Sequence, residues 1–129
     1  MRETHLSNKG VECLAAIPHI QCLRLTCNHI TDERVEIIGE NCVNLKDLNI
    51  SENLITSLKP LYKLKKLTSL TACLTDVTEC DNSWLKNSDI LFINLNMTFI
   101  EGSRLREISK ILESKSDKKS QYQSISIYC

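Results

Sequence analysis

The sequence predicts an α/β repeat fold in which short parallel strands alternate with helical return segments. The first observation is a pattern of apolar residues that recurs along the chain, in copies that begin at Ile20, Leu45, Leu67 and Ile90. The starts are 25, 22 and 23 residues apart, and self-similarity at such a period is typical of solenoid proteins. The second observation is that apolar and polar residues alternate inside each copy, as in a strand. The third is that the segments between copies carry apolar residues at helical spacing.

The register of the copies predicts where the strands lie. They are expected near 22–26, 47–51, 69–73, 92–96 and 124–128. The ninth position of a copy holds Asn28 or Asn53, whose amide can bond backbone groups of adjacent turns. Thr75 and Thr98 take this position in later copies. Their shorter reach predicts looser turns there.

The return segments are expected to be helical to different extents. The first helix is predicted over 32–41, with the Thr31 hydroxyl as its cap and acidic residues in its first turn. The second return contains Pro60 and has room for one or two helical turns. The third is predicted to be a single turn over 81–85, in which Trp84 closes the convex side.

The best late helix is predicted over 103–114, because Leu105, Ile108, Ile111 and Leu112 share one face. The polar segment 114–121 follows it and is predicted to be a solvated surface loop. An acidic residue between its lysines argues against a basic docking loop.

Composition sets the class of protein and excludes several partners. A length of 129 residues is enough for about one domain, and 16 basic residues balance 16 acidic ones, so no net charge favours nucleic acid or a membrane surface. No apolar stretch has the length of a membrane span. The start lacks an apolar signal, and the seven cysteines are an odd number, which favours reduced thiols. We therefore expect a cytoplasmic protein, with the nucleus as the alternative.

The repeated pattern resembles that of leucine-rich repeat proteins over nearly the whole chain. Residues 27–45 are similar to the cysteine-containing class found in F-box subunits of ubiquitin ligases, and 53–61 resemble the short 22-residue class. Residues 101–108 resemble the longer ribonuclease-inhibitor type. The resemblance implies a right-handed β/α solenoid with its parallel sheet on the concave face, and a protein that binds other proteins.

Both ends of the chain depart from this family pattern. The copy before Ile20 lacks its strand, and the last predicted strand ends at Cys129 without a polar cap. We therefore expect residues 1–129 to be a single domain of four or five repeats that is a fragment, an isoform or the product of a partial gene model. The alternative is a complete domain whose ends are covered by a partner. An unpaired parallel edge invites pairing, so a homodimer through the edge strand is a further hypothesis.

The concave face is the candidate binding site. The third, fifth and seventh positions of each copy should point to it, because the fourth and sixth point into the core. The residues predicted to bind a protein partner are Arg24, Asp47, Asn49, Thr71, Phe92, Asn94 and Asn96. Later copies also place apolar side chains on or beside this face, at Leu74, Phe92, Met97 and Tyr128, as protein contact surfaces do. The alternative is an ordinary solenoid surface, or a Phe92 ring that tucks under a loop.

Other chemistry finds little support in the sequence. His19, Cys22, Cys27 and His29 are close in sequence, but the repeat register separates them, so we predict no metal site. The three glycines form no phosphate-binding loop and no nucleophile elbow is present, so we predict no cofactor and no enzyme activity. Only Arg24 and Lys46 are basic on the predicted strands, too few for nucleic acid.

The sequence thus predicts a protein–protein interaction scaffold that binds a partner on its concave sheet. Two alternatives stay open. One is a substrate-receptor fragment of an F-box ubiquitin ligase, which would need an adaptor-binding segment before the repeats. The other is a structural array without a partner of its own.

Overall fold

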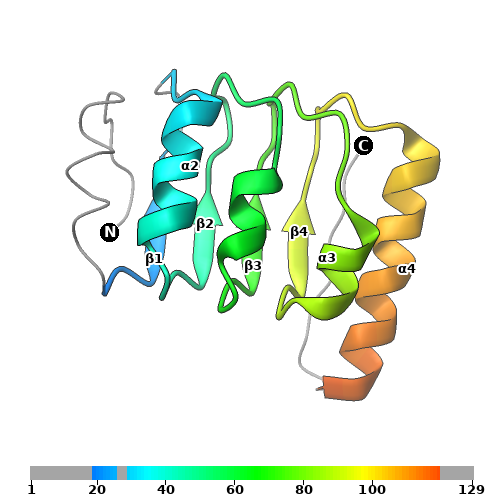
Figure 1. The fold of residues 1–129 in the computed structure, drawn as a ribbon. Helices are drawn as coiled ribbons and strands as arrows, with labels where there is room; N and C mark the ends of the chain where they lie inside the picture. The colour runs from blue at the N-terminus through cyan, green and yellow to red at the C-terminus, as the bar shows by residue number, and fades with distance from the viewer. Residues whose placement is uncertain (1–18, 26–28, 120–129) are drawn as a thin grey trace.

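A computed structural model describes residues 19–25 and 29–119, and only the backbone for 116–119. Four strands form one parallel sheet in chain order (Figure 1): β1 (Cys22–Arg24), β2 (Asp47–Asn49), β3 (Ser69–Thr71) and β4 (Phe92–Asn94). The register aligns equivalent positions of the repeats. The third position, for example, forms a row across the four strands that consists of Cys22, Asp47, Ser69 and Phe92. The repeat pattern is therefore also the spatial register of the sheet.

The strands begin where the sequence predicts and end two residues earlier. Backbone pairing nevertheless continues beyond them, because the N–H of Ile50 donates to the Thr71 carbonyl at 2.9 Å and that of Glu52 to the Cys73 carbonyl at 2.9 Å. The chain then bends at the eighth position of the repeat, where Glu52, Leu74 and Met97 have φ of 60°, 55° and 61°. The predicted strand at 124–128 lies outside the described residues, as does Thr26 at the end of the first.

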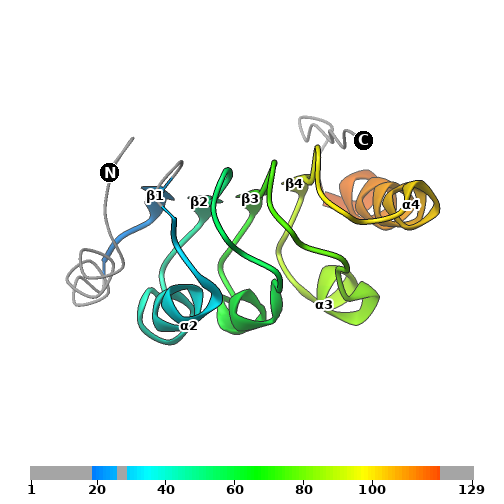
Figure 2. The same cartoon turned by 90° about the horizontal axis from the view of Figure 1, so that it is seen from above.

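The helical segments are α2 (Asp32–Asn41), the 3-10 helix η1 (Lys59–Lys63), α3 (Asn82–Asn87) and α4 (Gly102–Lys119). The first three lie on the opposite side of the sheet from its concave face, and α4 lies beyond β4 at the end of the array (Figure 2). The core between the two layers is aliphatic. The fourth and sixth positions of every repeat are fully buried in it: Leu23, Leu25, Leu48, Ile50, Leu70, Ala72, Ile93 and Leu95.

Helix α2 has the predicted bounds, but its predicted cap is wrong. The Thr31 side chain makes no capping hydrogen bond, although its backbone has the extended conformation that is usual at an N-cap. Thr31 also forms a β-bridge to Leu54 of the next repeat. The Asp32 carboxylate also reaches into the next repeat, where it accepts hydrogen bonds from the Thr56 N–H at 2.9 Å and the Thr56 hydroxyl at 2.5 Å. The Asp32 carboxylate in the first turn of α2 therefore links two adjacent coils through hydrogen bonds.

The second and third returns are short and pack through aromatic rings. Leu58, Leu61 and Leu64 of the η1 segment are buried. Trp84 of α3 is 9% exposed and stacks on Tyr62 of η1, with ring centroids 4.6 Å apart. The Asp81 carboxylate caps α3 by accepting from the Trp84 N–H at 3.0 Å. The pair covers the core on the convex side.

Helix α4 buries the predicted face but is longer than predicted. Leu105, Ile108 and Leu112 are buried and Ile111 is partly buried. The segment 114–121 was expected to be a loop, yet the helix runs to Lys119. The Lys115 ammonium donates to the Leu85 carbonyl at the end of α3 at 2.6 Å, and this contact supports an additional turn that the polar sequence alone does not indicate.

The ninth position of the repeat shows why asparagine and threonine differ. The Asn53 carbonyl oxygen accepts from the Ile30 N–H at 3.0 Å, and its amide donates to the carbonyls of Leu25 and Ile50. The Thr75 and Thr98 hydroxyls donate only three residues back, at 2.9 and 2.8 Å, within their own repeats.

The looser turns predicted at these threonines are not found. The Asp76 N–H donates to the Ile55 carbonyl at 2.9 Å and the Phe99 N–H to the Val77 carbonyl at 3.0 Å. The equivalent bond beside Asn53, from Leu54 to Ile30, is 2.9 Å. Backbone bonds between coils therefore hold the turns where the longer side chain is missing.

Candidate protein-binding surface

The seven predicted site residues come from the four strands and the turn after β4, and all lie on the concave face. Their neighbours at the fourth and sixth positions are buried, so the alternating strand geometry directs the third and fifth positions to the other face. The fifth-position row runs Arg24, Asn49, Thr71, Asn94 in direct register.

The site residues are accessible to different degrees. Arg24 is exposed, whereas the other six, including Phe92 and Asn96, are half-buried. Asn49 and Asn94 make the same local contact, because each side-chain oxygen accepts from the backbone N–H two residues later, at 3.1 and 3.0 Å. These bonds fix the side chains that the face presents.

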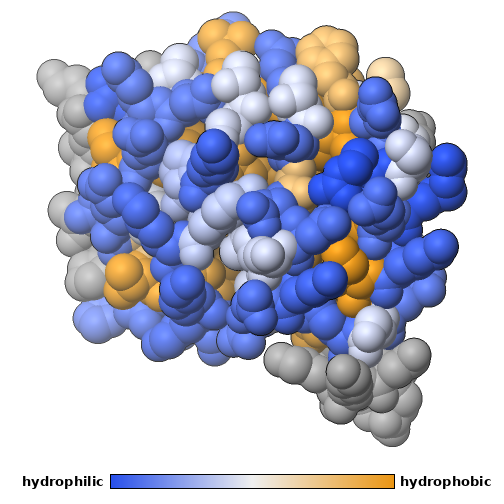
Figure 3. All heavy atoms as spheres, turned by 45° about the vertical axis from the view of Figure 1, so that its right-hand side comes forward, coloured by the Kyte–Doolittle hydropathy of each residue, from blue (hydrophilic) through white to orange (hydrophobic). Residues whose placement is uncertain are grey.

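An apolar edge adjoins this face where the chain leaves the strands. It consists of Leu54, Leu74, Met97 and Phe99, which are 55%, 50%, 61% and 68% exposed. Figure 3 shows apolar side chains gathered along the upper edge, above a mostly hydrophilic helical side. Leu74 and Met97 were expected beside the concave face, but Leu54 and Phe99 were missed. The signal was a second apolar residue directly before the buried Ile55 and Ile100.

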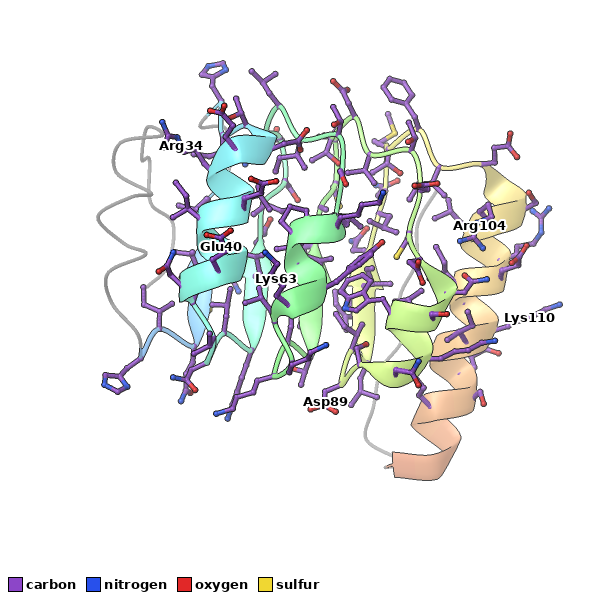
Figure 4. All side chains as sticks on the ribbon, viewed as in Figure 1. Arg34, Glu40, Lys63, Asp89, Arg104 and Lys110 are labelled. Atoms are coloured by element: carbon purple, nitrogen blue, oxygen red, sulfur yellow. The ribbon has the colours of Figure 1, made fainter. Side chains whose placement is uncertain are left out.

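Grooves are found on the convex side. One of about 730 Å³ lies between α3 and α4 and is lined by Lys86, Lys110, Ile111 and Lys115, among others. The Lys115 ammonium there is already held by the Leu85 carbonyl and the Ser88 hydroxyl. In Figure 4 Glu40 of α2 and Lys63 of η1 point toward one another across a more exposed contact, an ion pair of 3.6 Å. These groups serve contacts between coils.

The two buried cysteines on the described segments, Cys42 and Cys80, are not poised for chemistry. Burial raises the pKa of the Cys42 thiol. Burial also raises the pKa of Cys80 to about 12, although the Arg104 cation opposes the shift. A thiol with a raised pKa is a poor nucleophile at neutral pH. Over residues 19–25 and 29–119, no three His, Cys, Asp or Glu residues are grouped so that they could hold a metal ion.

Among the described residues, no helix combines the length and the apolar character that are needed to cross a membrane.

Comparisons with known proteins agree with this geometry. A profile of the family described as "Leucine Rich repeat" matches residues 16–33, which include β1 and the start of α2. The fold is that of a leucine-rich repeat solenoid. Its structure is similar to a crystal structure of internalin C2 from Listeria monocytogenes, with a TM-score of 0.57 and 25% sequence identity. No curated protein matches the chain.

The repeats support a general role as a protein-interaction scaffold, since leucine-rich repeat proteins are generally binding scaffolds rather than enzymes. The internalin match covers 88% of this chain and 44% of the internalin chain, so this chain spans less than half the length of that neighbour. The profile match does not separate the three repeat classes that the sequence resembles.

Proposed function

We propose that this leucine-rich repeat array binds a protein partner on its concave sheet. The observation that carries the proposal is the register of the sheet, which brings Arg24, Asn49, Thr71 and Asn94 into one row on one face. A rigid sheet that holds side chains in fixed order is pre-organised for recognition, because little conformational freedom is lost on binding. Phe92 adds an aromatic contact in the adjacent row.

The apolar edge supports the same proposal. Exposed large apolar side chains that gather at one place mark contact surfaces more often than scattered ones do. Leu74 and Met97 are at equivalent positions of adjacent repeats, since the Leu74 N–H donates to the Asn96 carbonyl at 2.9 Å. A partner that covers the concave sheet would reach this edge as well.

The experiment compares two double variants in a pull-down from a cell extract. Phe92→Ala with Asn94→Ala removes an aromatic ring and an amide from the concave face. Val43→Ala with Asn44→Ala is the matched control, because it removes an exposed apolar side chain and an amide beyond α2. The concave variant should lose its partner and the control should keep it, with melting temperatures near that of the wild type. Equal recovery of the partner by all three proteins would sink the proposal.

We also propose that the protein acts inside the cell, in the cytoplasm or the nucleus. Cysteines on the described segments support this, because Cys42, Cys73 and Cys80 are thiols that form no disulfide. A fluorescent fusion of the natural protein imaged in living cells tests the location, and secretion of the fusion would contradict it.

A further inference from the structure

The orientation of two amides on the concave face is fixed by their backbone contacts. The N–H of Ser51 donates to the Asn49 side chain at 3.1 Å, and the N–H of Asn96 donates to the Asn94 side chain at 3.0 Å. A backbone N–H can only donate, so the side-chain atom that it contacts must be the oxygen in both cases. The NH₂ group of each amide therefore lies on the other branch of the side chain.

These NH₂ groups belong to a row of hydrogen-bond donors. None of the described residues accepts a hydrogen bond from the NH₂ of Asn49 or Asn94, from the Thr71 hydroxyl or from the Arg24 guanidinium. The four side chains occupy the fifth position of consecutive repeats in direct register. The row thus presents three groups that can only donate and one hydroxyl that can do either.

The spacing of the row is that of the strands. Neighbouring strands are about 4.8 Å apart, so the row spans roughly 14 Å from Arg24 to Asn94. An extended peptide advances about 3.3 Å per residue, so roughly four or five residues that cross the strands would face all four side chains. A peptide backbone supplies carbonyl acceptors along that whole length.

We propose that this donor row binds an extended acidic peptide segment of the partner protein, which rests on the proposed function. Carbonyl and carboxylate oxygens complement the donors, whereas a basic side chain would meet donors with donors. An Asp or Glu of the segment faces Arg24, whose guanidinium suits a carboxylate. It does so at the β1 end of the row, at the fifth position, whereas the Asp47 carboxylate is in the adjacent row, at the third position of β2.

The opposite end of the row favours an apolar residue of the segment. Phe92 is two residues before Asn94 on β4 and lies on the same face. The segment therefore runs with its acidic residue over β1 and its apolar residue over β4. One arginine in the row is too little positive charge for a nucleic acid backbone.

The test first selects peptides that bind the full chain. It then replaces hydrogen-bond donors of the row by acceptors. A phage-displayed library of random 12-residue peptides is panned on the immobilised protein, and an enriched peptide is synthesised with a fluorophore. Its affinity is measured by anisotropy for the wild type, Asn49→Asp and Asn94→Asp. Aspartate keeps the oxygen that accepts from Ser51 or Asn96 but replaces the outward NH₂ by an acceptor. Each substitution should weaken binding of the peptide roughly tenfold or more, because a carboxylate oxygen then faces a peptide oxygen where an NH₂ group would donate a hydrogen bond.

The control variant is Asn44→Asp, which adds the same charge outside the concave face. The Asn44 oxygen accepts from the Lys66 ammonium at 2.8 Å, and aspartate keeps that contact. Its affinity for the peptide should equal that of the wild type, and thermal melts confirm that all variants are folded. The enriched peptides should contain Asp or Glu at one end and an apolar residue about four positions away.

Three results would overturn the donor row: no enriched peptide, enrichment of basic peptides, or wild-type affinity of both Asn→Asp variants. The assay also separates this proposal from the broader one through Phe92→Ala. Peptides that lose affinity with Phe92→Ala but not with the Asn→Asp variants leave the concave site standing without its donor row. Peptides that bind every concave variant as they bind the wild type count against both.

Discussion

Single side chains at the turn after each strand decide how one coil joins the next. Asn53 is 5% exposed and hydrogen-bonds to backbone groups of two coils. It therefore satisfies several backbone groups that would otherwise need water as a hydrogen-bond partner. The eighth position beside it adopts the left-handed conformation without glycine. Both features belong to single residues, and each gives a separate prediction.

Asn53→Ala should lower the free energy of unfolding by about 2–4 kcal/mol, because it leaves the buried Ile30 N–H and the Leu25 carbonyl without their partner. Chemical denaturation in urea measures the change. The matched variant Asn49→Ala loses one local bond at a half-buried position and should cost less than about 1 kcal/mol. Equal losses would mean that the bonds between coils add nothing.

Leu74→Gly should leave stability unchanged or raise it by up to about 1 kcal/mol, because glycine accepts the φ of 55° without the steric cost of a side chain. The control is Leu54→Gly, since Leu54 is similarly exposed and has no positive φ. Glycine there costs backbone entropy, about 0.5–1 kcal/mol. The melting temperature should therefore fall for Leu54→Gly and not for Leu74→Gly, and a larger loss at 74 than at 54 would contradict the argument.

Alkaline pH should destabilise the protein through Cys80. Burial raises its pKa from 9.0 to about 12, so between these values the unfolded chain loses the thiol proton while the folded chain keeps it. Stability from this group is complete below pH 9 and falls by up to about 1.4 kcal/mol per pH unit above it. Denaturation curves from pH 7 to 10.5 should show the fall, and Cys80→Ala should make it shallower. An unchanged slope in the variant would refute the assignment.

At the scale of elements, contacts between repeats set bounds and spacings that no single repeat encodes. Helix α2 begins at its predicted residue, yet its first acidic residue binds the next coil rather than its own N–H groups. Helix α4 extends to Lys119 with Lys115 bonded to α3. Helix α2 also packs closely on η1, and one glycine makes that approach possible.

Gly39→Ala should destabilise the protein by about 1–3 kcal/mol, although alanine is the better helix former by about 1 kcal/mol. A Cβ at position 39 would be 2.1 Å from the Pro60 carbonyl oxygen, and a backbone atom cannot move aside without displacing η1. Gly102→Ala is the control, because its Cβ would meet only the Arg106 side chain at 3.6 Å. Urea denaturation should show a loss at 39 and little change at 102; a gain at 39 would contradict the packing.

At the scale of the whole molecule, the array is nearly one-dimensional, because each repeat packs on its neighbours and the sheet order follows the chain. The grooves on the convex side hold side chains that bind other coils. The concave face is the surface for which we propose recognition. A sheet of this kind also has two edges.

The predicted homodimer through the edge strand belongs to this scale. The strand predicted at 124–128 lies outside the described residues, and the hypothesis stays a prediction. Sedimentation velocity at rising protein concentration should show a shift from monomer to dimer, because an unpaired strand edge offers free N–H and carbonyl groups. A monomer mass at every concentration would contradict it.

The sequence by itself determined the frame of this protein. The spacing of its apolar residues located all four described strands, the faces of the return helices and the concave positions, because burial repeats with the local period of strand and helix. It also indicated Leu74 and Met97 as apolar groups beside the concave face. The share of the site that follows from alternation was therefore predictable residue by residue.

Only the tertiary structure decided which groups are satisfied and which remain available. Asp32 could have capped its own helix, but the register of the next coil brings Thr56 to its carboxylate. The amides of Asn49 and Asn94 could have pointed either way until their oxygens bonded the following backbone N–H groups. These partners are chosen by the position of neighbouring chain segments in space, which a periodic sequence pattern does not encode.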